Sequence, residues 1–119
     1  MSLDPEEIEV ALGRLEHMVE AIDAIWRFTS DHDEASFTND EVVTLAAIAK
    51  FTVIGEAARK MPGSITTRYP GVEWRRAVHF RNFLVHVYDQ INPAYLWKTI
   101  EEDLPSMREE LSRIIAELS

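Results

Sequence analysis

Apolar residues recur at steps of three and four along the first quarter of the chain, which predicts an amphipathic helix from about Pro5 to Ser30. Asp4 stands before a proline, as expected of a residue that caps the start of this helix. The stretch from Asp31 to Asn39 is polar and acidic, and is predicted to be a loop. The next stretch, from about Asn39 to Met61, is apolar almost all round, which is typical of a central helix packed on two or more sides.

Proline and glycine pairs mark the turns of the second half. Pro62-Gly63 ends the second helix, and Pro70-Gly71 precedes a third predicted from about Val72 to Gln90. Asn92-Pro93 predicts the start of a fourth helix that reaches Leu118, and Pro105 should kink or break it near Leu104. No strand-like alternation of useful length occurs. The pattern therefore predicts an all-α fold, an up-and-down bundle of four to five helices in one domain over residues 1–119.

Composition narrows the class of protein. With 119 residues and 46% hydrophobic content, the chain is long enough for one core. It has no cysteine, which excludes disulfide scaffolds and thiolate metal sites. No segment approaches the roughly 20 apolar residues of a membrane span. The acidic start of the chain is the reverse of a signal peptide. We therefore expect a cytoplasmic protein with no membrane association.

The net charge of −9 would by itself argue against a nucleic-acid partner. The distribution changes this conclusion, because the segment from Ala57 to Tyr88 holds six basic residues and a single acidic one, Glu73. Charges act over about 8 Å at physiological salt, so a local basic patch can attract phosphate despite an acidic remainder. One basic segment on an acidic body keeps RNA among the candidate partners.

The predicted third helix carries most of the polar chemistry. At about 100° per residue, one arc of it is apolar and is predicted to face the core; it comprises Phe80, Phe83, Leu84 and Val87. The opposite half carries Arg75, His79, Asn82 and His86, while Tyr88 falls close to Arg81 on the wheel. Val78 and Val85 interrupt that polar half, which indicates a second buried face. A second subunit is the economical candidate to cover it.

Arg81 and His86 are the candidate catalytic pair. An arginine fork binds phosphate oxygens in pairs, and an imidazole exchanges protons near neutral pH. The two residues are about 140° apart on a straight helix, so a bound phosphodiester or a second chain would have to join them. Asn82 lies one turn before His86 and is predicted to support the site. Such a site needs no metal ion or cofactor if the ribose 2′-hydroxyl is the nucleophile.

Other polar residues have weaker assignments. Arg75 and Arg76 are candidate RNA contacts, together with His79, which also suits a surface or interface position. Glu56 lies within the apolar second helix, where a carboxylate needs a partner such as Arg59 or Arg81. No His-x3-His or similar spacing predicts a metal site. The residue types alone leave a structural role for His86 and Tyr88 open, because clustered titratable groups often serve structure.

The order Arg81-Asn82-x-x-x-His86-x-Tyr88 resembles the signature of the HEPN superfamily, in its HepT-like ribonuclease branch. The flanking blocks are similar too: Ile54-Gly55-Glu56-Ala57 upstream, Trp74 before the motif, then Leu96-Trp97 and Asp103-Leu104-Pro105. The resemblance covers roughly Leu12 to Ile115.

This resemblance implies a helical bundle that forms a homodimer through the motif helices. It also implies a metal-independent endoribonuclease that acts as the toxin of a toxin–antitoxin pair. Arg81 and His86 would be catalytic, Asn82 would support them, and Tyr88 would receive AMP from a minimal nucleotidyltransferase antitoxin. The alternative is a helical dimer that binds a nucleotidyltransferase or RNA without catalysis, or one that is purely structural.

Overall fold

The computed structural model describes residues 3–119, except for the side chain of Tyr88, and that part of the chain is helical with no strand. The helices are α1 (Pro5–Thr29), α2 (Glu34–Thr38), α3 (Glu41–Arg59), α4 (Gly63–Arg68), α5 (Trp74–His86), α6 (Pro93–Glu102) and α7 (Leu104–Leu118), with a 3-10 turn, η1 (Tyr88–Gln90), after α5. Five of these have ten or more residues, which confirms the predicted all-α bundle. No helix in the described residues is long and apolar enough to cross a membrane.

Side-chain caps fix the starts of three long helices where the sequence predicts them. The Asp4 carboxylate accepts a hydrogen bond from the Glu6 amide at 2.8 Å. Asp40 does the same for the Val43 amide at 3.1 Å, and Asn92 for the Ala94 amide at 2.9 Å. Each cap satisfies an amide that has no partner inside its helix. The predicted break near Leu104 is also confirmed, because α6 ends at Glu102 and Pro105 lies in the first turn of α7.

The prediction of a loop from Asp31 to Asn39 is wrong, since this stretch contains α2. A reciprocal cap starts the helix: Asp33 accepts from the Ser36 amide, and Ser36 accepts from the Asp33 amide. Phe37 is fully buried, with its ring 5.2 Å from that of Trp97. A five-residue helix held by one buried side chain is too short to show a periodic pattern. The short helix α4 escaped the sequence analysis for the same reason.

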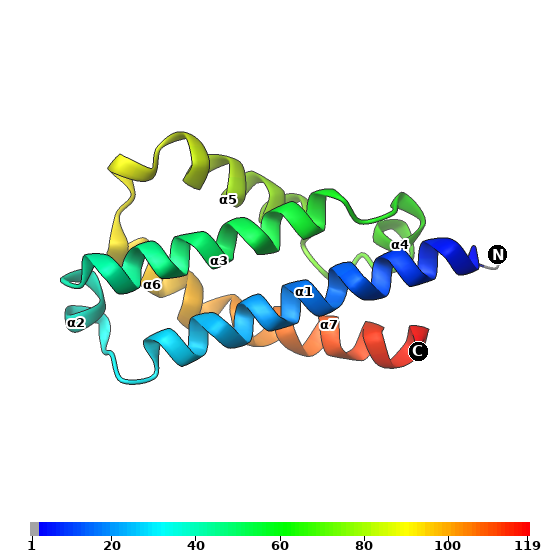
Figure 1. Cartoon of the computed structure of the whole chain (residues 1–119), viewed down its shortest axis with the longest axis horizontal. Helices are drawn as coiled ribbons and strands as arrows, with labels where there is room; N and C mark the ends of the chain where they lie inside the picture. The colour runs from blue at the N-terminus through cyan, green and yellow to red at the C-terminus, as the bar shows by residue number, and fades with distance from the viewer. Residues whose placement is uncertain (1–2) are drawn as a thin grey trace.

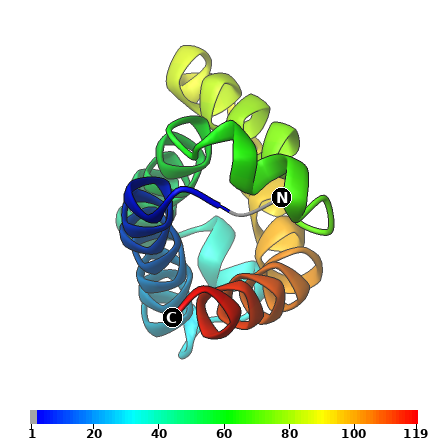
Figure 2. The same cartoon turned by 90° about the vertical axis from the view of Figure 1, so that its right-hand side faces the viewer.

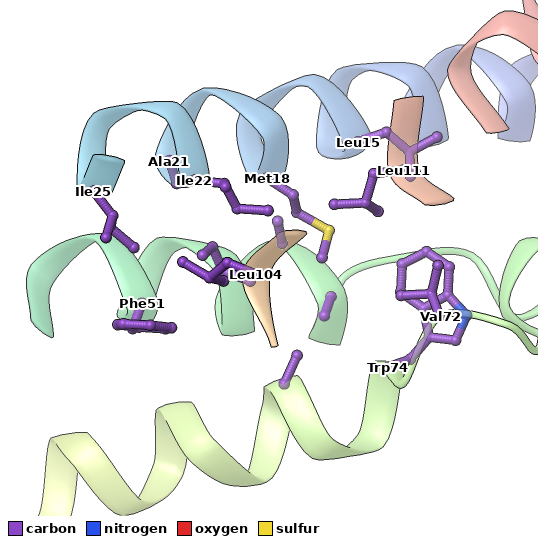
Figure 3. Close-up of a cluster of buried hydrophobic side chains, with 14 of the residues drawn as sticks. Leu15, Met18, Ala21, Ile22, Ile25, Phe51, Val72, Trp74, Leu104 and Leu111 are labelled. Carbon is purple, nitrogen blue, oxygen red and sulfur yellow. The ribbon is translucent and has the colours of Figure 1, made fainter. Parts of the chain in front are cut away.

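The core lies between α1, α3 and α7, and Figure 3 shows side chains from these helices meeting. Its fully buried members include Leu15, Met18, Ile22, Ile25, Leu104 and Leu111. Asp23 of α1 and Arg108 of α7 are joined at the surface by two hydrogen bonds, of 2.7 and 3.1 Å. These bonds hold the pKa of Asp23 below its ordinary value.

Helix α5 lies along α3 at the edge of the bundle, away from α1 and α7 (Figures 1 and 2). The central position predicted for the second helix is confirmed, because α3 packs against both α1 and α5. A third side of α3 is uncovered: Val42 is 79% exposed, Leu45 48% and Val53 41%. The position of α5 therefore depends on α3, and the three exposed residues form an apolar stripe on α3 itself.

Candidate functional site

Gly55 of α3 is a point of close contact with α5. A Cβ atom at this position would lie 2.1 Å from Arg81 Cβ and 2.8 Å from the Ala77 carbonyl oxygen. Neither distance is possible between real atoms, so no larger residue fits without moving one of the two helices. The contact seats the backbone of Arg81 directly against α3.

The guanidinium of Arg81 is partly buried, with 28% of the side chain exposed. Nη1 donates a hydrogen bond to Asn82 Oδ1 at 3.0 Å, and Nη2 lies 3.5 Å from Glu56 Oε2. Nε is buried without a hydrogen-bond partner among the described residues. An N–H···O hydrogen bond spans about 2.7–3.2 Å, so Glu56 holds Arg81 by charge rather than by a tight bond. Arg81 thus keeps donors for an anion.

Glu56 joins three cations in what we call the Glu56 cluster: Glu56, Arg59, Lys60 and Arg81. Arg59 donates to both carboxylate oxygens, at 2.6 and 3.3 Å, and Lys60 Nζ lies 3.5 Å away. The hydrogen bonds from Arg59 are the main reason that the pKa of Glu56 falls from 4.5 to about 2. The predicted pairing of Glu56 with Arg59 or Arg81 is confirmed for both. One carboxylate among three cations leaves the cluster with excess positive charge.

His86 is the last residue of α5 and is exposed. It stands five positions after Arg81, which in a helix amounts to about 140° of rotation and roughly 7.5 Å of rise. Asn82 was expected to support the site, and its amide oxygen binds the neighbouring Arg81. A single chain therefore offers an anion-binding side at Arg81 and a separate histidine at the helix end.

The predicted third helix is too long at both ends, because α5 covers only Trp74–His86. The amide of Val87 closes the helix on the Phe83 carbonyl at 3.0 Å, and Tyr88 begins η1. The wheel position predicted for Tyr88 is wrong for this reason. No glycine or proline marks this helix end, so the pattern gave no signal for it. The Tyr88 side chain lies outside the described residues, and its modification stays a prediction.

The three predicted RNA contacts differ in their surroundings. Arg75 and His79 are exposed. Arg76 is bound to Glu73 at 3.2 Å and to Asp103 at 2.9 Å, which ties α5 to the junction of α6 and α7. These carboxylates offset part of the positive charge that Arg76 would offer to RNA. The structure does not test whether the three residues contact RNA, and this stays a prediction.

A cavity of about 620 Å³ lies along α5, α6 and α7, with an apolar floor that includes Phe51 and Phe80. Phe83 lines this cavity and is 47% exposed, so its predicted place in the core is wrong. Leu84 of the same predicted arc is buried as expected, while Phe80 is half-buried. The difference arises because α5 packs mainly against α3, which covers only part of the apolar arc. Among the described residues, no three His, Asp or Glu side chains gather as metal ligands would.

Sequence reasoning missed the roles of Gly55 and Lys60. A glycine inside an otherwise apolar helix lowers the stability of that helix. Its presence therefore indicates that another part of the chain packs closely against it. Arg59 and Lys60 stand three and four residues after Glu56, the spacing at which side chains meet on a helix surface. Both signals were present in the sequence.

Comparison with known proteins gives consistent matches over most of the chain. The model of the family described as Ribonuclease HepT-like matches residues 18–114. A protein of Thermococcus cleftensis, named as a ribonuclease HepT, is 32% identical over 84% of this chain and 91% of its own length. Two proteins of Methanocaldococcus jannaschii that bear the name RNase are 33% and 32% identical, over 79% and 82% of this chain and 86% and 84% of their own lengths. No solved structure matches. The motif, the helical fold and these relatives agree, and the chain belongs to the HepT-like ribonuclease family.

Proposed function

We propose that this protein is a metal-independent endoribonuclease with Arg81 and His86 as its catalytic residues. The observation that carries the proposal is the Glu56 cluster, which has excess positive charge. It includes Arg81, whose Nη2 lies 3.5 Å from Glu56 Oε2, on the helix that ends at the exposed His86. Arg81 would bind the phosphate that is cut and stabilise the charge that develops on its oxygens. Membership of the HepT-like ribonuclease family also supports ribonuclease activity.

The proposed chemistry follows from the two side chains. The ribose 2′-oxygen attacks the adjacent phosphorus, and its proton passes to a general base. The bond to the 5′-oxygen breaks, and this leaving group takes up a proton. The products are a 2′,3′-cyclic phosphate and a free 5′-hydroxyl. The imidazole of His86 suits one of these proton transfers, because it can accept or donate near neutral pH. Cleavage of RNA by the purified protein in EDTA tests the proposal.

We further propose that the protein is a homodimer built on the exposed face of α3 and α5. Val42, Leu45 and Val53 share an arc of about 80° on α3, and Glu56 lies within it. Val85 of α5 is 42% exposed and belongs to the helix that carries Arg81. An apolar stripe beside a charged cluster is typical of a protein–protein contact. A second copy here would bring two sets of Arg81 and His86 to one cleft.

The dimer proposal predicts that Val85→Asp gives a monomer with little cleavage activity, because a buried unpaired carboxylate opposes the interface. Light scattering during gel filtration measures the mass. Val10→Asp is the matched control, since Val10 is 48% exposed on α1 and should tolerate the charge. A Val85→Asp variant that remains dimeric would rule out this face as the interface.

We propose that Tyr88 is the site of control, and that a minimal nucleotidyltransferase antitoxin adds AMP to its hydroxyl. Tyr88 stands two residues after His86 in the matched signature. Each AMP adds negative charge and bulk beside the phosphate-binding residues, so repulsion and occlusion would both stop RNA from binding. We propose that toxin and antitoxin meet in the cytoplasm, where RNA and nucleoside triphosphates are both present; cell fractionation tests the location.

Co-expression with a minimal nucleotidyltransferase should add AMP-sized mass increments to the protein and abolish its cleavage activity. Tyr88→Phe should remove the increments and leave cleavage intact, because the phenyl ring keeps the shape of the side chain. Intact-protein mass spectrometry reads the increments. Increments that persist in Tyr88→Phe would assign the modification to another residue.

A further inference from the structure

The contact between Arg81 and Glu56 crosses from one helix to another, whereas the other contacts of Glu56 lie within α3. Arg59 and Lys60 are three and four residues away on the same helix, and such local pairs are common on exposed surfaces. They would satisfy the carboxylate without help from α5. Arg81 reaches Glu56 from 25 positions further along the chain, only because Gly55 lets the two helices touch beside it.

We propose that Gly55 and Glu56 together position Arg81 for RNA cleavage. Gly55 sets the location of the Arg81 backbone, and Glu56 sets the orientation of the guanidinium. Glu56 is a positioning residue in this scheme, since it acts through Arg81 and touches no reacting atom. The inference rests on the proposed function, in which Arg81 binds the phosphate.

The distances around Glu56 hold the Arg81 guanidinium in place and still allow it to bind a phosphate. The 3.5 Å separation of Arg81 Nη2 from Glu56 Oε2 leaves the donors of Arg81 uncommitted to a tight carboxylate pair. Arg59 takes the strong hydrogen bonds of Glu56 instead, at 2.6 and 3.3 Å. A phosphate can therefore approach Arg81 without first breaking a fork-to-carboxylate bond. The pKa of Glu56, about 2, keeps its charge constant wherever RNA would be cut.

The test is Glu56→Gln, which keeps the shape of the side chain and removes its charge. We expect kcat to fall by about 10- to 100-fold, because misplaced catalytic groups cost that much in rate. KM should stay the same or fall, because the variant is more positive near the phosphate. Glu110→Gln is the matched control: Glu110 pairs with Arg113 at the same 2.6 Å and the same i,i+3 spacing, but on α7. It should leave both constants unchanged.

A double-mutant cycle separates positioning from a general structural effect. In an Arg81→Ala background, Glu56→Gln should cause no further loss of kcat. An equal further loss would show that Glu56 acts by another route and would overturn the inference. Glu56→Asp, which keeps the charge on a shorter stem, should recover part of the rate. If Arg81→Ala lowers kcat while Glu56→Gln does not, the inference fails and the proposed function stands.

If Arg81→Ala cleaves RNA at the wild-type rate, Arg81 is not catalytic, and a cleavage assay cannot test whether Glu56 holds it. An NMR measurement on Arg81 tests this without RNA cleavage. The Nε–H group of Arg81 is buried, so its NMR signal should be resolved and slow to exchange with water in the wild type. Glu56→Gln should merge this signal with those of exposed arginines and speed its exchange. An unchanged signal would show that Glu56 does not hold the guanidinium. Melting temperatures of the two glutamine variants control for loss of the fold.

Discussion

Replacing His86 with alanine is expected to reduce RNA cleavage by about 10²- to 10⁴-fold, the usual contribution of a positioned general acid or base. His86 is exposed at the end of α5, so its removal leaves no cavity and should not disturb the fold. The loss should appear in kcat, because the proposed function assigns binding of the phosphate to Arg81 and proton transfer to His86. Under the proposed toxin role, expression of the wild type alone should stop cell growth, and the alanine variant should relieve this.

The measurement is a cleavage assay on RNA in EDTA, with the products examined for 2′,3′-cyclic phosphate ends. His17→Ala is the matched control, because His17 is an exposed histidine on α1, a helix that does not carry the motif. Two outcomes would contradict the proposal in different ways. A His86→Ala variant that cuts at the wild-type rate would exclude His86 as the catalyst. A wild type that leaves RNA intact but forms a firm complex with the nucleotidyltransferase would favour the non-catalytic dimer.

Replacing Gly55 with alanine should lower the free energy of unfolding by about 1–3 kcal/mol, the usual cost of an extra methyl group in a packed interface. The new Cβ would meet the Cβ of Arg81 and the backbone carbonyl of Ala77, and neither can swing away as a flexible side chain would. Helix α5 must therefore move from α3, which carries Arg81 away from Glu56. Cleavage should fall together with stability.

Gly13→Ala provides the opposite expectation in the same protein. Gly13 lies inside α1, and a Cβ atom there would meet nothing within 4 Å. Alanine should stabilise the protein by roughly 0.5–1 kcal/mol, because glycine is a poor helix former. Urea unfolding of both variants measures the difference. If Gly55→Ala also stabilises the protein and keeps its activity, α3 and α5 do not make a close contact at Gly55.

The sequence and the structure disagree mainly where a distant contact decides the outcome. The stretch that holds α2 has the pattern of a polar loop, with Phe37 as its one large apolar residue. Phe37 is buried against Trp97, sixty positions later, and local spacing cannot reveal this contact. Arg76 is predicted to contact RNA, a prediction that stays untested, and the sequence pattern gives no sign of the ion pair that Arg76 makes with Asp103 at the junction of α6 and α7. Phe83 reads as a core residue, and it lines an open cavity.

The amino-acid sequence by itself determines the long helices, the caps at Asp4 and Asn92, the break before Leu104, and the signature from Arg81 to Tyr88. These features depend on residues no more than a few positions apart, so their spacing along the chain is enough to reveal them. The sequence names Arg81 as one possible partner of Glu56, and the tertiary structure decides that the two residues meet. Only the packing of α5 on α3 brings Gly55 and Glu56 beside Arg81, and a pattern that repeats every 3.6 residues carries no record of which helix will be the neighbour.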